Sequence, residues 1–272
     1  MVKRSSEDIK ELMKPIVGLS GEYIADGGET PLGSTGVRIT VPTYPVWGPP
    51  PPMVNLGYEF TWLDTPGAWN LPSEFHEYRI GASWIRTLSD NWKTRAWAGI
   101  SINTEGENTS SDALQFRGGL LAIYSSVPEY EWIMGVVALG RSDLPAVPAL
   151  GLNYRPHEDW TFEFTFPRPQ ATYTYKRSFD RQLSVFMGGG LNGTTWAYLE
   201  TNGQENQLTY SDWRIVCGWE SAPLSNSENR FTPGKRIRIE TGYVFDRELE
   251  FETLRPTISL NDAWTVNVLF SY

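Results

Sequence analysis

The chain has 272 residues, with 32 acidic and 23 basic side chains and a formal net charge of −9. This acidic balance argues against nucleic acid as a partner, because phosphate binding needs clustered lysine and arginine. The single cysteine excludes an internal disulfide, and no uninterrupted apolar stretch reaches the roughly 18 residues that a membrane-spanning helix requires. Aromatic residues make up 14% of the chain, a content that aromatic girdles at two membrane interfaces would explain.

The first predicted element is a short amphipathic helix over residues 6–14. Ser5 and Asp8 have the spacing of a capping box, and Pro15 ends the helical pattern. We assign residues 1–17 to an N-terminal periplasmic helical segment, which is either a frayed leader or a periplasmic latch or lumen plug. The segment is charged and lacks the apolar core of a secretory signal. For an outer-membrane protein, the signal would therefore have been removed or would lie upstream.

From residue 18 onward, apolar and polar residues alternate with a period of two, which indicates strands. The predicted strands are 18–25, 35–44, 53–63, 75–88, 92–104, 113–125, 130–140, 148–155, 159–166, 170–177, 182–199, 208–220, 235–247 and 263–272. Short turns and longer polar loops alternate between them, as in barrels with short periplasmic turns and long outer loops. The fold class is therefore all-β. Residues 18–272 are expected to form a single antiparallel up-and-down transmembrane β-barrel of about 14 strands. The alternative is 12 strands, because eight-residue strands are short for a full crossing.

Proline-rich segments interrupt this pattern at two places. The prolines at 167 and 169 suit an outer turn, since proline cannot donate to a strand ladder. The stretch 45–52, with four consecutive prolines, predicts a stiff polyproline turn, with a partner-recognition segment as the alternative.

The last strand is aromatic and apolar on one face, polar on the other, and terminal, which is how many outer-membrane barrels finish. We expect this strand to be recognised by the barrel-assembly machinery. Across the barrel, the aromatic side chains expected to face lipid are Tyr58, Phe60, Trp62, Trp160, Phe162, Phe164, Trp213, Trp219, Tyr243, Phe245, Trp264, Phe270 and Tyr272. The charged side chains expected to line the lumen are Glu59, Lys93, Arg95, Arg117, Glu163, Arg214, Glu220, Arg236, Arg238 and Glu240. Mixed charge there would either line a water-filled pore or pair across the lumen and close it.

Three segments carry a family resemblance: G-E-Y-I-A-D-G-G-E at 21–29, R-S-D-L-P-A-V-P-A-L-G-L-N-Y-R-P at 141–156 and D-W-T-F-E-F-T-F-P-R-P at 159–169. They resemble an uncharacterised family of bacterial proteins that is carried as a domain of unknown function and regarded as outer-membrane β-barrels. The resemblance runs from about residue 18 to the end. The resemblance implies a β-barrel fold and a bacterial outer-membrane location. Its motifs correspond to turns and strands and carry no catalytic residues.

Catalytic and cofactor-binding patterns are weak. A Ser-His-Asp hydrolase would have to use His76 or His157, the only two histidines, and two histidines with one cysteine do not make a typical zinc site. The triple glycine at 188–190 is not followed by the Lys-Ser or Lys-Thr of a phosphate loop, so it predicts a bulge or a close backbone approach. We therefore expect no enzyme activity, no metal and no cofactor.

The function most favoured by the sequence is a passive, porin-like channel for small polar solutes, held in outer-membrane lipid. A non-conducting structural or adhesion barrel is the first alternative, and a soluble β-sandwich binding module, with aromatic platforms for carbohydrate, is the second. Uptake of a hydrophobic substrate past an N-terminal plug depends on the 6–14 helix entering the barrel.

Overall fold

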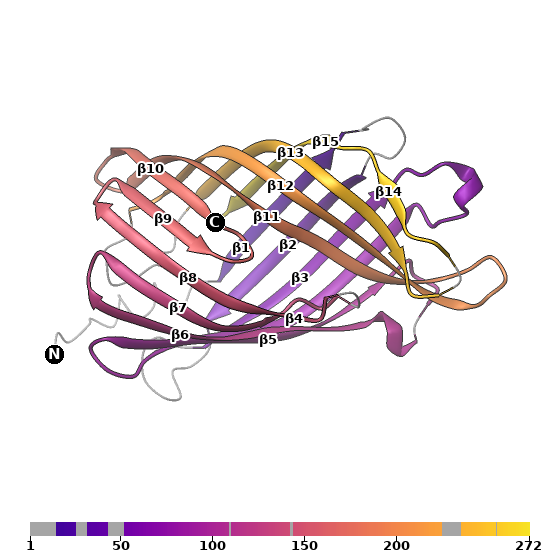
Figure 1. Cartoon of the computed structure of the whole chain (residues 1–272), viewed down its shortest axis with the longest axis horizontal. Coiled ribbons are helices and arrows are strands. Elements are labelled where there is room, and N and C mark those ends of the chain that lie inside the picture. Colours follow the sequence, from indigo (N-terminus) through magenta and orange to yellow (C-terminus); the bar gives the residue numbers. More distant parts are fainter. Residues whose placement is uncertain are drawn as a thin grey trace.

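The computed structural model describes residues 15–25, 32–42, 52–108, 110–141, 144–224, 235–253 and 255–272. Within them the chain is an antiparallel β-sheet that curls round and closes on itself (Figure 1). The expected helix at 6–14 and most of the proline-rich stretch lie outside the described residues.

Two short 3-10 turns lie between strands: η1 (Gly67–Trp69) and η2 (Ser111–Ala113). The strands are β1 (Ile16–Ile24), β2 (Leu32–Pro42), β3 (Met53–Leu63), β4 (Glu74–Thr87), β5 (Trp92–Thr104), β6 (Leu114–Val127), β7 (Tyr130–Ala138), β8 (Ala146–His157), β9 (Trp160–Thr165), β10 (Gln170–Arg177), β11 (Arg181–Leu199), β12 (Glu205–Pro223), β13 (Arg236–Phe251), β14 (Ile258–Leu260) and β15 (Ala263–Ser271). The first strand begins two residues before the expected boundary.

From β1 to β14 each strand pairs with the next in the chain, β15 pairs with β13, and the ring closes where β1 pairs with β15. Val17 and Tyr272 exchange two backbone hydrogen bonds of 2.8 Å at this seam. The short β14 pairs only with β13, so 14 strands form the wall of the described barrel. The 14-strand prediction is confirmed and the 12-strand alternative is wrong. The two-layer sandwich is also wrong, because a single sheet closes on itself.

The two ends of the barrel differ. At the end where β1 begins and β15 ends, called here the turn side, β4–β5, β6–β7, β8–β9 and β10–β11 are joined by short turns. At the opposite end, the loop side, lie η1, η2, β14 and the β11–β12 hairpin (Figure 1). This alternation is the one that the sequence predicts, except that the β2–β3 and β12–β13 connections of the turn side are longer.

The outer face of the wall is a belt of large apolar side chains. Trp264 is 65% exposed, Leu150 64%, Phe116 60% and Met187 60%. Soluble monomers rarely expose such a continuous apolar surface, because contact with water is unfavourable. The belt is therefore the lipid-facing surface of a transmembrane β-barrel of the bacterial outer-membrane type.

The barrel narrows toward the loop side, because β11 makes a direct contact with β5 there. Ala197 pairs in parallel with Thr104, and Asn103 donates a 2.9 Å hydrogen bond from Nδ2 to the carbonyl of Thr195. The sequence gives no sign of this contact, which brings together strands that are about 90 residues apart in the chain. At this level β11 is joined directly to β5 instead of through β6–β10.

A β-bulge in β13 adjusts which side chains enter this narrow end. Asp246 has a positive φ of 51°, and the pairing with β12 shifts register between Ser211 and Trp213. One extra residue reverses the inward and outward alternation beyond it. As a result Leu249 is fully buried, as is Val244 on the other side of the bulge. The strand predicted at 235–247 is longer than expected, since β13 continues to Phe251.

Candidate functional site: the lumen

The loop-side end of the lumen is filled with apolar side chains. This cluster, called here the apolar plug, contains Ile24, Leu32, Leu63, Phe75, Trp196, Tyr198, Leu208, Tyr210, Val244, Leu249, Leu260 and Ala263. Trp196 is only 2% exposed and stacks on Phe75, with 4.7 Å between the ring centroids. The plug joins side chains of β11 and β12 to side chains of β1–β4, so it packs one wall of the barrel against the other.

A polar clasp lies just beyond the plug, in the loop-side turn that follows β11. Glu200 accepts hydrogen bonds from Tyr198 Oη at 2.7 Å, Asn206 Nδ2 at 2.9 Å and Arg255 Nε at 2.8 Å. Burial acts to raise the pKa of Glu200, but these hydrogen bonds and the charge of Arg255 lower it below its ordinary value. The clasp therefore keeps Glu200 ionised and ties the β13–β14 connection to the β11–β12 hairpin.

Two polar cavities lie in the lumen. The upper cavity, of about 480 Å³, reaches Leu32, Trp196 and Tyr210 of the apolar plug. The lower cavity, of about 640 Å³, extends to strand ends on the turn side, such as Ile16 and Ser271. Both cavities are lined by Ser20, Arg38, Glu59, Glu77, Arg79 and Arg117. These side chains therefore lie at the level where the two cavities meet.

The centre of this shared level is a carboxylate held by two arginines. Glu77 is 5% exposed and accepts hydrogen bonds from Arg79 Nε at 2.6 Å and from both terminal nitrogens of Arg117, at 3.2 and 3.3 Å. Arg117 also donates to Thr194 Oγ1 at 3.2 Å, which links β6 to β11. Charge-assisted, bidentate bonds of this kind are stronger and more rigid than neutral ones.

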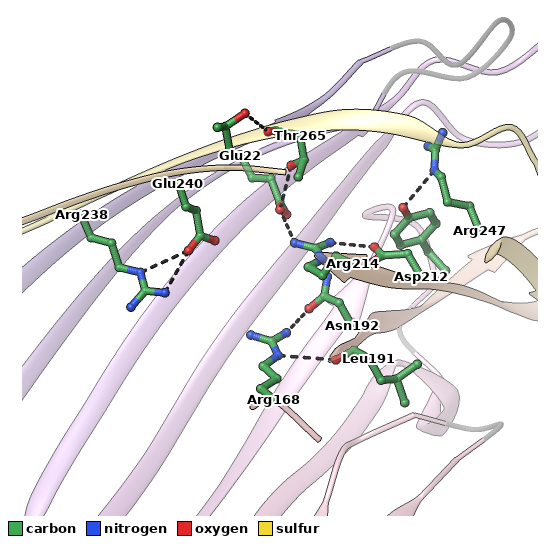
Figure 2. A network of polar contacts seen from close by, with 12 residues as sticks. Glu22, Arg168, Leu191, Asn192, Asp212, Arg214, Arg238, Glu240, Arg247 and Thr265 are labelled. Atoms are coloured by element: carbon green, nitrogen blue, oxygen red, sulfur yellow. Dashed lines mark hydrogen bonds and ion pairs between the residues drawn. The ribbon is translucent and has the colours of Figure 1, made fainter. Parts of the chain in front are cut away.

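A second ionic group joins β12 to β1. Asp212 is fully buried and receives two hydrogen bonds from Arg214, of 2.8 and 2.7 Å. The remaining terminal nitrogen of Arg214 lies 2.5 Å from Glu22, which also accepts a 3.4 Å hydrogen bond from Thr265 (Figure 2). Three ionised side chains thus satisfy one another within the sheet wall.

A third group lies on β13. Arg238 bonds Glu240 at 3.1 Å and Gln170 at 2.8 Å, and its guanidinium carbon is 3.7 Å from the centre of the Phe186 ring. Glu220 lies 3.7 Å from Arg238 and 4.0 Å from Arg236. These charges bind one another along the wall.

Two arginines from outer connections cover an edge of β11 that none of the described strands pairs with. Arg168, in the turn between β9 and β10, donates to the side chain of Asn192 and to the carbonyl of Leu191 (Figure 2). Arg141, in the β7–β8 connection, donates to the carbonyl of Asn192 at 3.3 Å. An unpaired strand edge otherwise leaves carbonyl groups without partners. The outer turn expected at 167–169 therefore turns inward and lines the upper cavity.

The charged residues singled out from the sequence lie in three kinds of place. Glu59, Arg95, Arg117 and Arg236 line a cavity. The second and third ionic groups hold Arg214, Glu220, Arg238 and Glu240. The remaining two belong neither to a cavity lining nor to these ionic groups: Lys93 is exposed near the turn-side end of β5, and Glu163 is partly buried on β9 opposite Gln170.

Sequence reasoning left out several side chains of these groups. Glu77 and Arg79 share the inward face of β4 with buried Phe75, so the alternation that marks lumen residues could have found them. Glu22, Arg38 and Asp212 also lie within predicted strands. Nothing in the sequence marks Arg168, because a turn residue acquires its partner only through the fold.

The aromatic residues expected to face lipid belong to strands whose alternate side chains form the outer belt. Exposed fractions are 40% for Trp160, 56% for Phe164, 38% for Trp213, 40% for Tyr243 and 65% for Tyr272. Others pair on the same surface: Tyr58 contacts His76, and Trp219 donates a 2.8 Å hydrogen bond to Tyr175. These aromatic side chains are therefore not buried between two stacked sheets, as they would be in a β-sandwich.

Neither histidine lies in a catalytic arrangement in the described structure. His76 Nδ1 is 2.9 Å from the hydroxyl of Tyr58, and His157 is 3.3 Å from Asp159 in an exposed turn. The described ranges contain no group of three or more His, Cys, Asp or Glu side chains placed to hold a metal ion. No helix in the part of the chain that the structure describes is both long and apolar enough to span a membrane.

The triple glycine at 188–190 accommodates the inward turn at 167–169. A Cβ on Gly190 would lie 1.9 Å from the carbonyl oxygen of Pro167, and the φ of Gly190 is +135°. We expect Gly190→Ala to push this turn away and to strain the backbone, with a loss of about 1–3 kcal/mol in unfolding free energy. Urea unfolding in detergent micelles measures the loss. Gly67→Ala is the matched control, because a Cβ there meets nothing within 4 Å. Equal stability of both variants would contradict the close approach.

Three solved structures are similar to this chain at low sequence identity. The barrel resembles the β-domain of the Bordetella autotransporter BrkA, at 9% identity, 95% coverage of this chain, 98% of that one and a TM-score of 0.39. It also resembles the Acinetobacter baumannii outer membrane protein Omp33, at 11% identity, 96% and 97% coverage and a TM-score of 0.37. An outer membrane channel from Pseudomonas putida F1 matches at 9% identity, 94% coverage of both chains and a TM-score of 0.42.

No curated protein sequence gives a significant match. A family model does match, over residues 54–256, which is most of the chain. The model is described as a domain of unknown function, and the match agrees with the resemblance seen in the sequence. The chain therefore belongs to the DUF6268 family and has the architecture of an outer-membrane β-barrel.

Proposed function

We propose that the protein is a closed, non-conducting barrel of the bacterial outer membrane, not an enzyme. The observation that carries this proposal is the apolar plug, which fills the narrowed loop-side end of the lumen. Ions do not cross a dry, close-packed apolar region, because removing their hydration costs far more than the region returns.

The backbone supports the same conclusion. The plug is closed by hydrogen bonds between β5 and β11, including the bond from Glu105 N to Ala197 O at 3.3 Å. Leu199 N donates a further 2.7 Å bond to Glu105 Oε1. Opening the lumen at this end would expose several backbone and apolar groups at once. The outer belt would hold the barrel in lipid, and β15 would offer the barrel-assembly machinery its C-terminal strand.

Conductance in a planar lipid bilayer tests the proposal. We expect the folded full chain to insert without producing stable unitary current steps. Folding is checked beforehand by heat-modifiable migration on a detergent gel. Steady, reproducible current steps from the folded wild-type chain would contradict a closed lumen.

A porin-like channel for small polar solutes is the second candidate. It is favoured by the two cavities, which meet at a shared level and extend from the turn side as far as the plug. This function would require the plug to move, so it predicts current steps that depend on the packing of the plug. If the solute path bypassed the plug instead, the protein would conduct whether or not plug residues were substituted.

A further inference from the structure

The lumen cavities are positively charged although the chain as a whole is acidic. The charged residues that line one or both cavities are seven arginines and three glutamates: Arg38, Arg79, Arg95, Arg117, Arg141, Arg168 and Arg236, with Glu22, Glu59 and Glu77. The whole chain carries a formal charge of −9. The excess of arginine is therefore specific to the cavity lining.

Two of these arginines have no carboxylate within ion-pair distance among the described residues. Arg38 lines both cavities, and no hydrogen bond or ion pair to it forms within the part of the chain that the structure describes. Arg168 lines the upper cavity, and its hydrogen bonds to described residues go to neutral oxygens, those of Asn192 and Leu191. Their charge is therefore not cancelled by a bonded carboxylate, in contrast to Arg117 and Arg214.

The lining suits a particular ligand chemistry. The planar guanidinium group matches carboxylate and phosphate oxygens, and it keeps its charge at any physiological pH. Cavities of about 480 and 640 Å³ lie within the usual range of small-molecule sites. We propose that the lumen binds a small, multiply charged oxyanion, a polycarboxylate or an organic or inorganic phosphate, in the upper cavity that Arg38 and Arg168 both line.

This inference goes beyond the proposed closed barrel and does not depend on it. A non-conducting lumen could hold the anion as a ligand that enters from the turn side, where the lower cavity reaches the strand ends. A conducting lumen would show the same site as a preference for anions. Equilibrium binding and conductance therefore test the two proposals separately.

Titration calorimetry on the folded full chain in detergent, at low ionic strength, tests the site. Citrate and pyrophosphate are the anionic probes, trimethyl citrate is the neutral probe and spermine is the cationic probe. We expect saturable binding of citrate, pyrophosphate or both, and none of trimethyl citrate. The stronger of the two anions identifies carboxylate or phosphate as the preferred class.

Arg38→Gln is expected to weaken binding of the preferred anion by about tenfold, the effect of one lost charge-assisted contact. Arg38→Lys should retain part of the affinity. Arg168→Gln provides an independent variant if Arg38→Gln does not fold. The matched control is Arg86→Gln, which removes the same charge from a side chain that stacks on Trp84 and lines neither cavity.

Three outcomes would overturn the inference. The first is spermine binding as tightly as the anions. The second is identical affinity in the wild type, Arg38→Gln and Arg168→Gln. The third is no saturable binding of either anion to the folded wild-type chain, whether or not that chain conducts.

Discussion

Replacing Trp196 with alanine is expected to reduce the unfolding free energy by about 3–5 kcal/mol, the usual cost of truncating a large buried aromatic residue. The side chain is 2% exposed, stacks on Phe75 and forms part of the apolar plug. Its removal leaves a cavity that the surrounding walls fill only in part. Urea unfolding in micelles, followed by circular dichroism, measures the loss, and the bilayer assay should show a leak that the wild type lacks.

The matched control for this variant is Trp264→Ala. Trp264 is 65% exposed on the outer belt, so lipid or detergent fills the space that its truncation leaves. The loss of stability should be clearly smaller, and no leak should appear. Two results would show that the plug does not close the lumen. One is an equal loss of unfolding free energy in both variants. The other is a Trp196→Ala barrel that conducts no current and has lost no stability.

Replacing Arg214 with methionine is expected to reduce the unfolding free energy by about 3–5 kcal/mol, because one partner of a buried ion pair is removed. Asp212 is fully buried and receives two hydrogen bonds from Arg214, and Glu22 lies 2.5 Å from the same guanidinium. Without Arg214, the carboxylate of Asp212 would have to remain charged without its bonded partner or take up a proton. Urea unfolding at neutral pH measures the cost.

A double-mutant cycle gives the control for this prediction. In the Asp212→Leu, Arg214→Met variant no unpaired carboxylate is left at position 212, so its stability should exceed that of Arg214→Met alone. Arg236→Met is a further comparison, since its side chain is 45% exposed and lies 4.0 Å from its nearest carboxylate. Strictly additive losses at 212 and 214 would mean that the buried pair does not act as a unit.

The strands could be predicted from the sequence because alternation is a local property. A barrel wall has lipid on one side and a polar lumen on the other, so each strand carries its own two-residue pattern. Trp264, Val266 and Val268, for example, are exposed on the outer belt, while Thr265 between them is 2% exposed. The number of strands followed from the alternation of short turns and long loops, and the proline-containing turn at 167–169 was correctly separated from its flanking strands.

The lumen could be predicted only in part. Charges on an inward face are visible in the pattern, as for Arg117 and Arg214, but their partners are not. Arg117 meets Glu77 from 40 positions earlier, and Arg214 meets Glu22 from 192 positions earlier. Such pairs depend on strand register and on the curvature of the sheet, neither of which a single strand encodes.

The sequence by itself determined that the chain is a β-barrel with a lipid-facing belt and a charged interior, because each strand sorts its side chains between two environments. Only the tertiary structure decided which side chains fill the loop-side end of the lumen. The contact between β5 and β11, the bulge at Asp246 and the inward turn that carries Arg168 bring distant residues together. The physical reason is that a wall is specified strand by strand, whereas its closure depends on which distant segments come to lie side by side.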